Sequence, residues 1–216
     1  MVYVYVGVVT NTSAMEPLDR FLAFLNKFIP LGSDDFQARI VPYIELRTIN
    51  KKDIITRVGE VENYINFIGS GLMRKYFVKE NDEIVTQISR EGQFIQAQES
   101  FHSRTQSEYC IDALEPTSLL SIKYDNLETI YTSGASMERL GRLVVTFGLM
   151  LADRWQMNLL KLSPRERFLQ FVKGNPELMQ RVPQKYLASL LNIQPETFSR
   201  FKHLLRTPPL KGEEAF

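Results

Sequence analysis

Apolar side chains recur at helical spacing near the N-terminus and again through the last third of the chain, with a different pattern between them. Residues 17–28 predict an amphipathic helix. Ser33-Asp34-Asp35 predicts the cap and acidic first turn of a second helix, which ends near Pro42. From Ser136 onward the helical spacing returns. The pattern therefore predicts helices on both sides of a central region.

The central region, after Glu45, consists of short β-branched or aromatic runs separated by polar turns. The runs are ELRTIN, DIITRV, YINFIG, LMRKYFV, EIVTQIS, YCIDAL and SLLSI. About seven short strands joined by hairpin-sized turns favour an antiparallel sandwich or roll over a parallel sheet. The predicted fold class is α+β, with an N-terminal antiparallel β-roll, or double-stranded β-helix, flanked by helices.

Residues 136–161 predict one long helix that carries a heptad seam. The seam consists of Leu140, Leu143, Phe147, Met150 and Arg154. Such a seam is typical of helices that pair, so we predict that this helix joins two copies of the chain. A single buried helix without a partner is the alternative, because the repeat extends over only about three heptads.

The stretch from Val182 to Leu205 predicts two short helices joined by Asn192-Ile193-Gln194, with Pro195 in the first turn of the second helix. This pattern is typical of a helix-turn-helix motif, although pairs of short amphipathic helices also occur in other α-rich domains. The expected core consists of Ala188, Leu191, Ile193, Phe198 and Phe201. The outward side chains are Glu196, Thr197, Ser199, Arg200, Lys202 and His203. A carboxylate, hydroxyls and cations on one helix face can contact base edges and phosphates.

The composition is ordinary for a globular protein, with 216 residues, 44% hydrophobic, 24% charged and a net charge of +1. A DNA-binding surface must therefore be a local concentration of basic residues. The last third of the chain supplies Lys161, Arg165, Arg167, Lys173, Arg181, Lys185, Arg200, Lys202, His203 and Arg206. No apolar run reaches the roughly 20 residues of a membrane span, so we expect no membrane partner and a cytoplasmic location.

The same composition argues against an enzyme or a metal centre. A metal-binding roll needs a cluster of histidines and carboxylates, and the chain has only two histidines, His102 and His203. The single cysteine, Cys110, excludes an internal disulfide and a cysteine-ligated iron–sulfur cluster within one chain. No catalytic triad or phosphate-binding loop occurs, so we predict no catalytic residue, no metal and no cofactor.

Several segments resemble the Crp/Fnr superfamily of bacterial transcription regulators. Glu196-Thr197-Phe198-Ser199-Arg200 is similar to the E-T-x-S-R signature of the family's recognition helix. Ser163-Pro164-Arg165-Glu166-Arg167 is similar to the stretch that opens its DNA-binding domain. Residues 53–71 resemble the K-G-D…F-I-x-x-G phrasing of its cyclic-nucleotide-binding-like roll, although Lys51-Lys52-Asp53 lacks the usual glycine. The resemblance covers about residues 16–205.

This resemblance implies a homodimeric regulator that binds double-stranded DNA, with RNA polymerase as a further partner. It implies that Arg200 contacts a guanine, that Glu196 accepts a hydrogen bond from a cytosine amino group, and that Ser199 contacts a neighbouring base or methyl group. These pairings agree with the donor and acceptor pattern of the major groove. The side chains placed for phosphates are Thr197, Lys202 and Gln184.

Family members that bind cyclic AMP carry an F-G-E-…-R-[ST]-A cassette, from which this chain departs. Gln96 or Ala97 stands where the glutamate is expected, and Gln106 or Ser107 where the arginine is expected. Without that cation a cyclic phosphate is poorly compensated, so the sequence does not favour a cyclic nucleotide. We expect Glu99, His102 and Arg104 to be solvated loop residues. An unknown small-molecule effector stays open, in a pocket formed by Phe94, Gln96, Arg104, Gln106 and Ser107.

Two functional alternatives stay open beside the DNA-binding regulator. One is a regulator that does respond to cyclic AMP. The other is a small-molecule-binding roll that acts through protein contacts, with a DNA surface that has degenerated. The combination of Glu196, Ser199 and Arg200 argues against this last alternative, because a surface that no longer met DNA would not need it.

The predicted domains are an N-terminal extension (1–14), a cyclic-nucleotide-binding-like roll (15–135), a dimerisation helix (136–161), a helix-turn-helix domain (162–206) and a disordered tail (207–216). The extension lacks the positive n-region of a signal peptide. It either precedes a natural start at Met15 or adds a strand. The family's β-hairpin wing has no counterpart after the second helix, so one set of phosphate contacts is expected to be missing.

Overall fold

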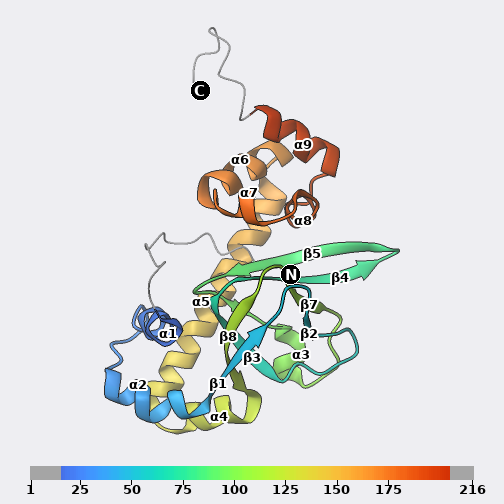
Figure 1. The fold of residues 1–216 in the computed structure, drawn as a ribbon. Coiled ribbons are helices and arrows are strands. Elements are labelled where there is room, and N and C mark those ends of the chain that lie inside the picture. Colours follow the sequence, from blue (N-terminus) through green and yellow to red (C-terminus); the bar gives the residue numbers. More distant parts are fainter. Residues whose placement is uncertain (1–15, 205–216) are drawn as a thin grey trace.

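The computed structural model describes residues 16–204, which form a β-roll, one long helix beside it and a C-terminal helical unit above it (Figure 1). The predictions for the N-terminal extension and for residues 205–216, including Arg206, lie outside the described residues.

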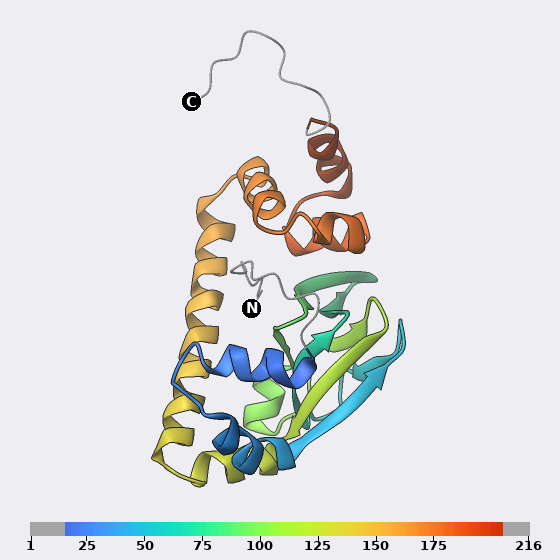
Figure 2. The same cartoon turned by 60° about the vertical axis from the view of Figure 1, so that its left-hand side comes forward.

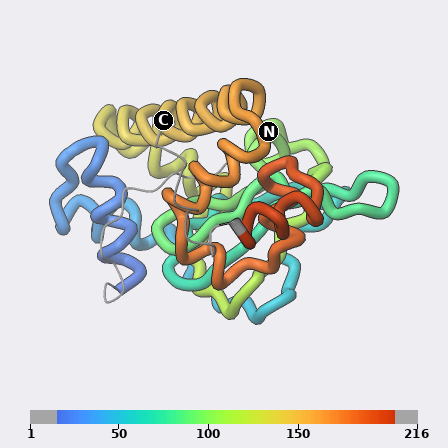
Figure 3. The backbone as a smooth tube through the Cα atoms, turned by 90° about the horizontal axis from the view of Figure 1, so that it is seen from above, coloured from blue at the N-terminus to red at the C-terminus, as the bar shows by residue number. Residues whose placement is uncertain are grey.

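Within residues 16–204, eight antiparallel strands form the predicted roll. They are β1 (Ile44–Ile49), β2 (Ile54–Thr56), β3 (Tyr64–Ser70), β4 (Leu72–Lys79), β5 (Asp82–Arg90), β6 (Phe94–Ile95), β7 (Cys110–Ala113) and β8 (Thr117–Lys123). They make two sheets of four strands, in the orders β1-β8-β3-β6 and β2-β7-β4-β5. Alternate side chains from both sheets fill the interior, including Ile68, Met73 and Ile111. The β4–β5 hairpin projects beyond the rest of the roll (Figure 3).

Two helices precede the roll, and two more that the sequence pattern did not reveal lie within it and after it. The first pair is α1 (Pro17–Leu25) and α2 (Ser33–Arg39), followed by the 3-10 turn η1 (Val41–Tyr43). The second pair is α3 (Gln98–Ser103) and α4 (Tyr124–Thr132). Glu99 and His102 are exposed, as expected, but they lie on α3 and not in a loop, because α3 is a short polar helix without apolar periodicity.

The long helix is α5 (Ala135–Lys161), which runs along one side of the roll to the C-terminal unit (Figure 2). That unit contains α6 (Pro164–Gly174), α7 (Leu178–Arg181), α8 (Gln184–Leu190) and α9 (Pro195–Leu204). The start of α6 follows from local sequence. Ser163 accepts a hydrogen bond from the Glu166 backbone, and the Glu166 side chain accepts one from the Ser163 backbone, which together make a capping box.

Two further apolar clusters lie outside the roll interior and join the parts. The first packs α1, α2 and α4 against β3 and the start of α5, around Phe24, Phe36 and Phe67. The second lies between the roll and the C-terminal unit. It combines Leu72 and Ile88 of the roll with Trp155 of α5 and Phe168 of α6. The C-terminal unit therefore shares a buried core with the roll, which fixes the position of α8 and α9.

Candidate nucleic-acid interface

The helix pair α8–α9 has the predicted helix-turn-helix construction. Asn192 ends α8 in the left-handed region at φ 51°, a conformation that Asn tolerates better than most residues. The Ile193 backbone N–H donates to Ala188 O at 2.9 Å, which closes the turn. Ala188, Leu191 and Phe198 are each 0% exposed. The predicted core is confirmed, and it leaves one side of α9 free to face solvent.

The polar residues predicted for this interface lie on the outer side of α9 and at the start of α8. Glu196 and Arg200 are exposed, whereas Thr197, Ser199 and Lys202 are partly buried. Gln184 of α8 lies close to the α9 side chains, because a shallow hollow of about 110 Å³ is lined by Gln184, Ser199, Lys202 and His203. The structure therefore brings Gln184 together with the side chains of α9, as one DNA-facing surface requires.

This surface has unused hydrogen-bonding capacity. Among residues 16–204, the side chains of Glu196 and Ser199 make no hydrogen bond and no ion pair. The Arg200 guanidinium lies 5.9 Å from the ring of its neighbour Phe201, a distance at which its donors stay available. A carboxylate, a hydroxyl and a guanidinium that are not committed within the described chain can accept and donate to a ligand.

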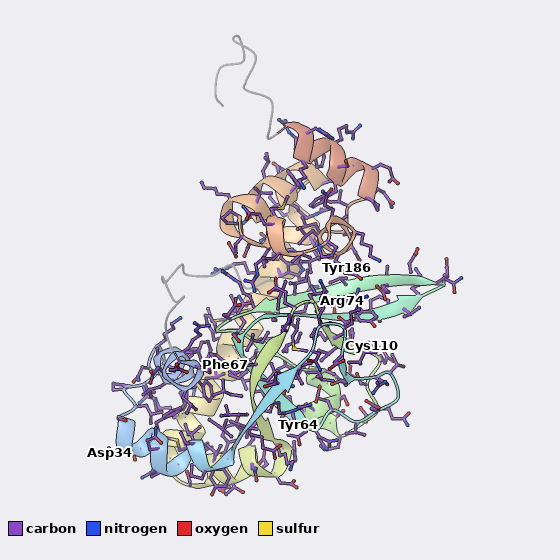
Figure 4. All side chains as sticks on the ribbon, in the orientation of Figure 1. Asp34, Tyr64, Phe67, Arg74, Cys110 and Tyr186 are labelled. Atoms are coloured by element: carbon purple, nitrogen blue, oxygen red, sulfur yellow. The ribbon has the colours of Figure 1, made fainter. Side chains whose placement is uncertain are left out.

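A dense polar contact attaches α8 to the roll. Arg74 of β4 is 4% exposed, and its guanidinium lies 4.1 Å from the centroid of the Tyr76 ring. It also lies 3.9 Å from the centroid of the Tyr186 ring of α8 (Figure 4). Its guanidinium donates to both oxygens of Asp112 at 2.8 Å and to Glu83 at 2.6 Å. Burial disfavours the charged guanidinium, but the hydrogen bonds to the two carboxylates outweigh it and raise the pKa of Arg74.

A second polar contact attaches α7 to the roll. Arg181 donates to Glu115 at 2.6 Å and to Glu91 at 2.8 Å, and these hydrogen bonds raise its pKa. In α8, Ser189 Oγ accepts a hydrogen bond from the Val85 backbone N–H at 2.9 Å, on the edge strand β5. The unit that carries α9 is therefore held to the roll by hydrogen bonds as well as by the shared core.

These contacts correct the predicted basic surface at two positions. Arg181 pairs with carboxylates of the roll. Arg167 is 9% exposed and donates to four backbone carbonyls, two at the C-terminal end of α5 and two in the turn between α8 and α9. Neither arginine faces outward, so the sequence pattern overestimated the cations available to phosphates.

The five predicted effector residues do not form one pocket. Phe94 and Gln96 line a cavity of about 60 Å³ between the roll and α5, together with His102 and Tyr131. Gln106 and Ser107 line a separate hollow of about 340 Å³. Arg104 lines neither and is used structurally. It donates to Glu62 O at 2.7 Å and Asn63 Oδ1 at 2.6 Å, and its guanidinium lies 4.6 Å from the Tyr124 ring.

The interior of the roll holds a buried acid and a buried base that the sequence analysis missed. Glu62 and Lys75 are each 3% exposed. The Glu62 carboxylate accepts hydrogen bonds from Thr56 at 2.7 Å and from the Ala97 backbone at 3.4 Å. Burial raises the pKa of Glu62, although these hydrogen bonds oppose the rise. Burial also lowers the pKa of Lys75 to about 8, against the attraction of Glu62. Neither residue falls in a recognisable motif, which is why sequence reasoning did not find them.

The predicted seam of α5 lies only partly on the surface. Leu140 is 4% exposed, and Leu143 and Phe147 are partly buried against the chain's own N-terminal cluster. The ring of Phe147 lies 5.4 Å from that of Phe28. Met150 and Arg154 are exposed. The predicted residue set was therefore wrong for Leu140, because the apolar stripe of α5 turns toward the roll in its first half.

The part of the chain that the structure describes contains no group of three or more His, Cys, Asp or Glu residues that could hold a metal ion. None of its helices has the length and apolar character that crossing a membrane would need.

The comparison with solved structures identifies the fold of this chain. No protein-family model matches the sequence, and no curated protein matches it. Among solved structures, FixK2 from Bradyrhizobium japonicum matches with a TM-score of 0.63 at 17% identity, over 76% of this chain and 84% of that chain. CLP from Xanthomonas campestris matches with a TM-score of 0.62 at 16% identity, over 81% and 92%. A structure described as a Crp/Fnr-family transcriptional regulator from Eubacterium rectale matches at 0.60 and 14%, over 83% and 88%.

The chain has a Crp/Fnr-like fold. The sequence resemblance to that superfamily is thereby confirmed at the level of architecture. The segment that resembles the family's E-T-x-S-R signature lies on α9, and α3 lies within the stretch that was compared above with the cyclic-AMP cassette.

Proposed function

We propose that this protein is a homodimeric, sequence-specific DNA-binding transcription regulator that acts in the cytoplasm. The observation that carries the proposal is the uncommitted polar face of α9, on a helical unit that shares a buried core with the roll. Supporting it, the solved structures with this fold include CLP, described as a c-di-GMP-responsive global regulator, and the Crp/Fnr-family regulator from Eubacterium rectale.

The chemistry of the face fits base readout. A guanidinium matches the O6/N7 acceptor pair of guanine, so Arg200 specifies a G·C pair. Glu196 lies one helical turn before Arg200 on α9 and accepts from a cytosine amino group, and Ser199 contacts the neighbouring base or its methyl group. The exposed Gln184 and the partly buried Thr197 and Lys202 contact phosphates, which position the helix without specifying a base.

Dimerisation uses the outer side of α5. Its exposed apolar side chains are Val145 (45%), Leu149 (63%), Met150 (58%), Met157 (52%) and Leu160 (76%). A stripe of this kind on one helix fits a second copy of itself, because identical helices can bury it symmetrically. A dimer also supplies the two recognition helices that two half-sites one DNA turn apart require. RNA polymerase as a further partner stays a prediction from the resemblance.

The roll is inferred to work without a cyclic nucleotide. The small cavity beside α5 is lined by the uncharged Gln87, Gln96 and Gln98 and by His102, whose pKa is lowered by partial burial, so its lining offers no lysine or arginine to a phosphate. Arg104 is bound to Glu62 O and Asn63, and Lys75 lies beside Glu62 in the interior. An effector that fits this cavity is therefore small and uncharged.

The test is selection of binding sequences from a random duplex pool, followed by titration of the selected site at fixed salt with and without cyclic AMP. The wild type is expected to select a palindrome and to show no nucleotide response. Arg200→Ala is expected to lose about 1–3 kcal/mol of preference at one G·C pair and to keep its melting temperature. Absence of any enriched sequence, with and without nucleotide, would contradict the proposal.

A further inference from the structure

Arg167 is a buried arginine of the C-terminal unit. It lies on α6 and is 9% exposed. Among residues 16–204 its guanidinium makes no ion pair with a carboxylate. Burying an unpaired cation is costly unless hydrogen bonds compensate it. Its partners therefore indicate what it does.

All of its partners are backbone carbonyls from two separate segments. Nη1 donates to Leu159 O at 3.2 Å and Leu162 O at 2.7 Å, at the C-terminal end of α5. Nε donates to Leu191 O at 2.9 Å, and Nη2 donates to Asn192 O at 3.0 Å, in the turn between α8 and α9. One planar side chain therefore links the end of the long helix to the turn of the helix-turn-helix pair.

Helix polarity explains how this site stabilises a cation without an acid. The C-terminal end of a helix carries a partial negative charge, because its last carbonyls lack partners within the helix. Leu159 and Leu162 close α5, and Leu191 is the C-terminal cap of α8. Arg167 therefore lies between two negative helix ends, and its five donors in one plane satisfy carbonyls from both.

We propose that Arg167 is a positioning residue that fixes the orientation of α8–α9 relative to α5 and thereby sets the half-site spacing that the dimer accepts. The inference rests on the proposed function, since spacing has meaning only for a dimer on DNA. Apolar contacts such as those of Trp155 and Phe198 hold the same parts together, but they are not directional. Hydrogen bonds to carbonyls at fixed angles are directional. Arg167 is therefore the directional contact that joins the end of α5 directly to the turn between α8 and α9.

Arg167→Lys separates positioning from simple stabilisation. A lysine keeps the charge and most of the length, but its ammonium is a point donor that cannot reach both segments in one plane. We expect the variant to fold and to keep the base preference that Arg200 provides. The wild type should bind the preferred palindrome more tightly than palindromes with one or two base pairs inserted between the half-sites. In the variant we expect this ratio of affinities to fall about tenfold.

Leu178→Ala is the matched control. Leu178 lies on α7 and is 3% exposed in the same apolar cluster, so its truncation destabilises the unit without removing a hydrogen bond to α5. Both variants are compared with the wild type at temperatures where the folded fractions are equal. A relaxed spacing preference in Arg167→Lys alone supports the proposal. Equal, uniform weakening of all sites by both variants overturns it.

A second measurement does not depend on DNA. Spin labels at Asp153→Cys on α5 and Gln194→Cys in the turn, in a Cys110→Ser background, report the distance distribution between the two elements. Dilution with unlabelled protein removes distances between copies. The distribution is expected to be narrow with Arg167 and with Leu178→Ala, and broad with Arg167→Lys. Equal widths overturn the positioning role. A wild type that selects no DNA sequence contradicts only the proposed function, and the distances then still decide whether Arg167 positions the unit.

Discussion

Polar side chains in the roll and on α9 are used in opposite ways. In the roll, the Glu62 carboxylate is bound by Thr56 and by backbone donors, and Arg104 donates to backbone and side-chain acceptors nearby. On α9, Glu196 and Ser199 make no hydrogen bond within residues 16–204, although the residue types are similar.

The difference shows that residue type alone does not identify a binding site. Buried polar groups are almost always satisfied, so a satisfied cluster is the ordinary result of folding. An exposed cluster that retains donors and acceptors can be satisfied by a ligand as well as by water. The roll's polar residues therefore support its architecture, whereas those of α9 are available for recognition.

Substitution of Arg74 should give the largest effect on stability and so tests the first half of this comparison. Arg74→Met removes a buried guanidinium from Asp112, Glu83 and Tyr186, and leaves the Asp112 carboxylate without its bidentate partner. We expect a loss of about 3–5 kcal/mol in the free energy of unfolding, measured by urea denaturation.

The control for Arg74 is another arginine of the roll. Arg57 pairs with Glu60 at 3.6 Å with both side chains at least half exposed, at 59% and 50%. Arg57→Met should cost less than about 1 kcal/mol, because exposed ion pairs contribute little. Similar losses for both variants would show that the contact between β4 and α8 does not stabilise the protein as the geometry indicates.

Substitution of Arg104 should lower the stability by less than substitution of Arg74. The contribution of its backbone conformation can be measured separately by comparing two variants. Arg104 is the C-terminal cap of α3 at φ 60°, a left-handed conformation that glycine adopts without strain. Arg104→Ala and Arg104→Gly both lose the contacts to Glu62 O and Asn63. We expect the alanine variant to be less stable than the glycine variant by about 1 kcal/mol in thermal unfolding. A more stable alanine variant would contradict the left-handed cap.

Local sequence signals predicted the parts of the fold that depend on nearby residues. The turn at Asn192 and the short β-branched or aromatic runs of the strands depend on a few neighbouring positions, so the sequence reveals them. The helix α3 was missed because its polar residues show no period. Glu62 was missed for another reason, because it lies in no recognisable motif and its partner Ala97 is distant in the sequence.

The candidate site was predicted unevenly for a related reason. The outer side of α9 follows from helical periodicity, so Glu196, Ser199 and Arg200 could be placed from sequence. The sequence could not show which cations are used inside the folded chain, because Arg167 and Arg181 meet their partners through tertiary contacts. For the same reason Leu140 turned inward on α5, although its spacing matches that of the exposed residues.

Substitution of Lys202 should have the smallest effect on stability, and it tests whether the polar side chains of α9 are available for recognition. Lys202 is partly buried beside Gln184 and Ser199, where an ammonium can neutralise a phosphate without reading a base. Lys202→Ala should leave thermal unfolding within about 0.5 kcal/mol of the wild type. It should weaken all duplexes by the same factor and reduce the slope of log affinity against log salt by about one. A change in base preference at unchanged salt slope would instead show that Lys202 contacts a base edge. Lys202 would then belong with Arg200 among the side chains that specify the sequence, and not among those that contact phosphates.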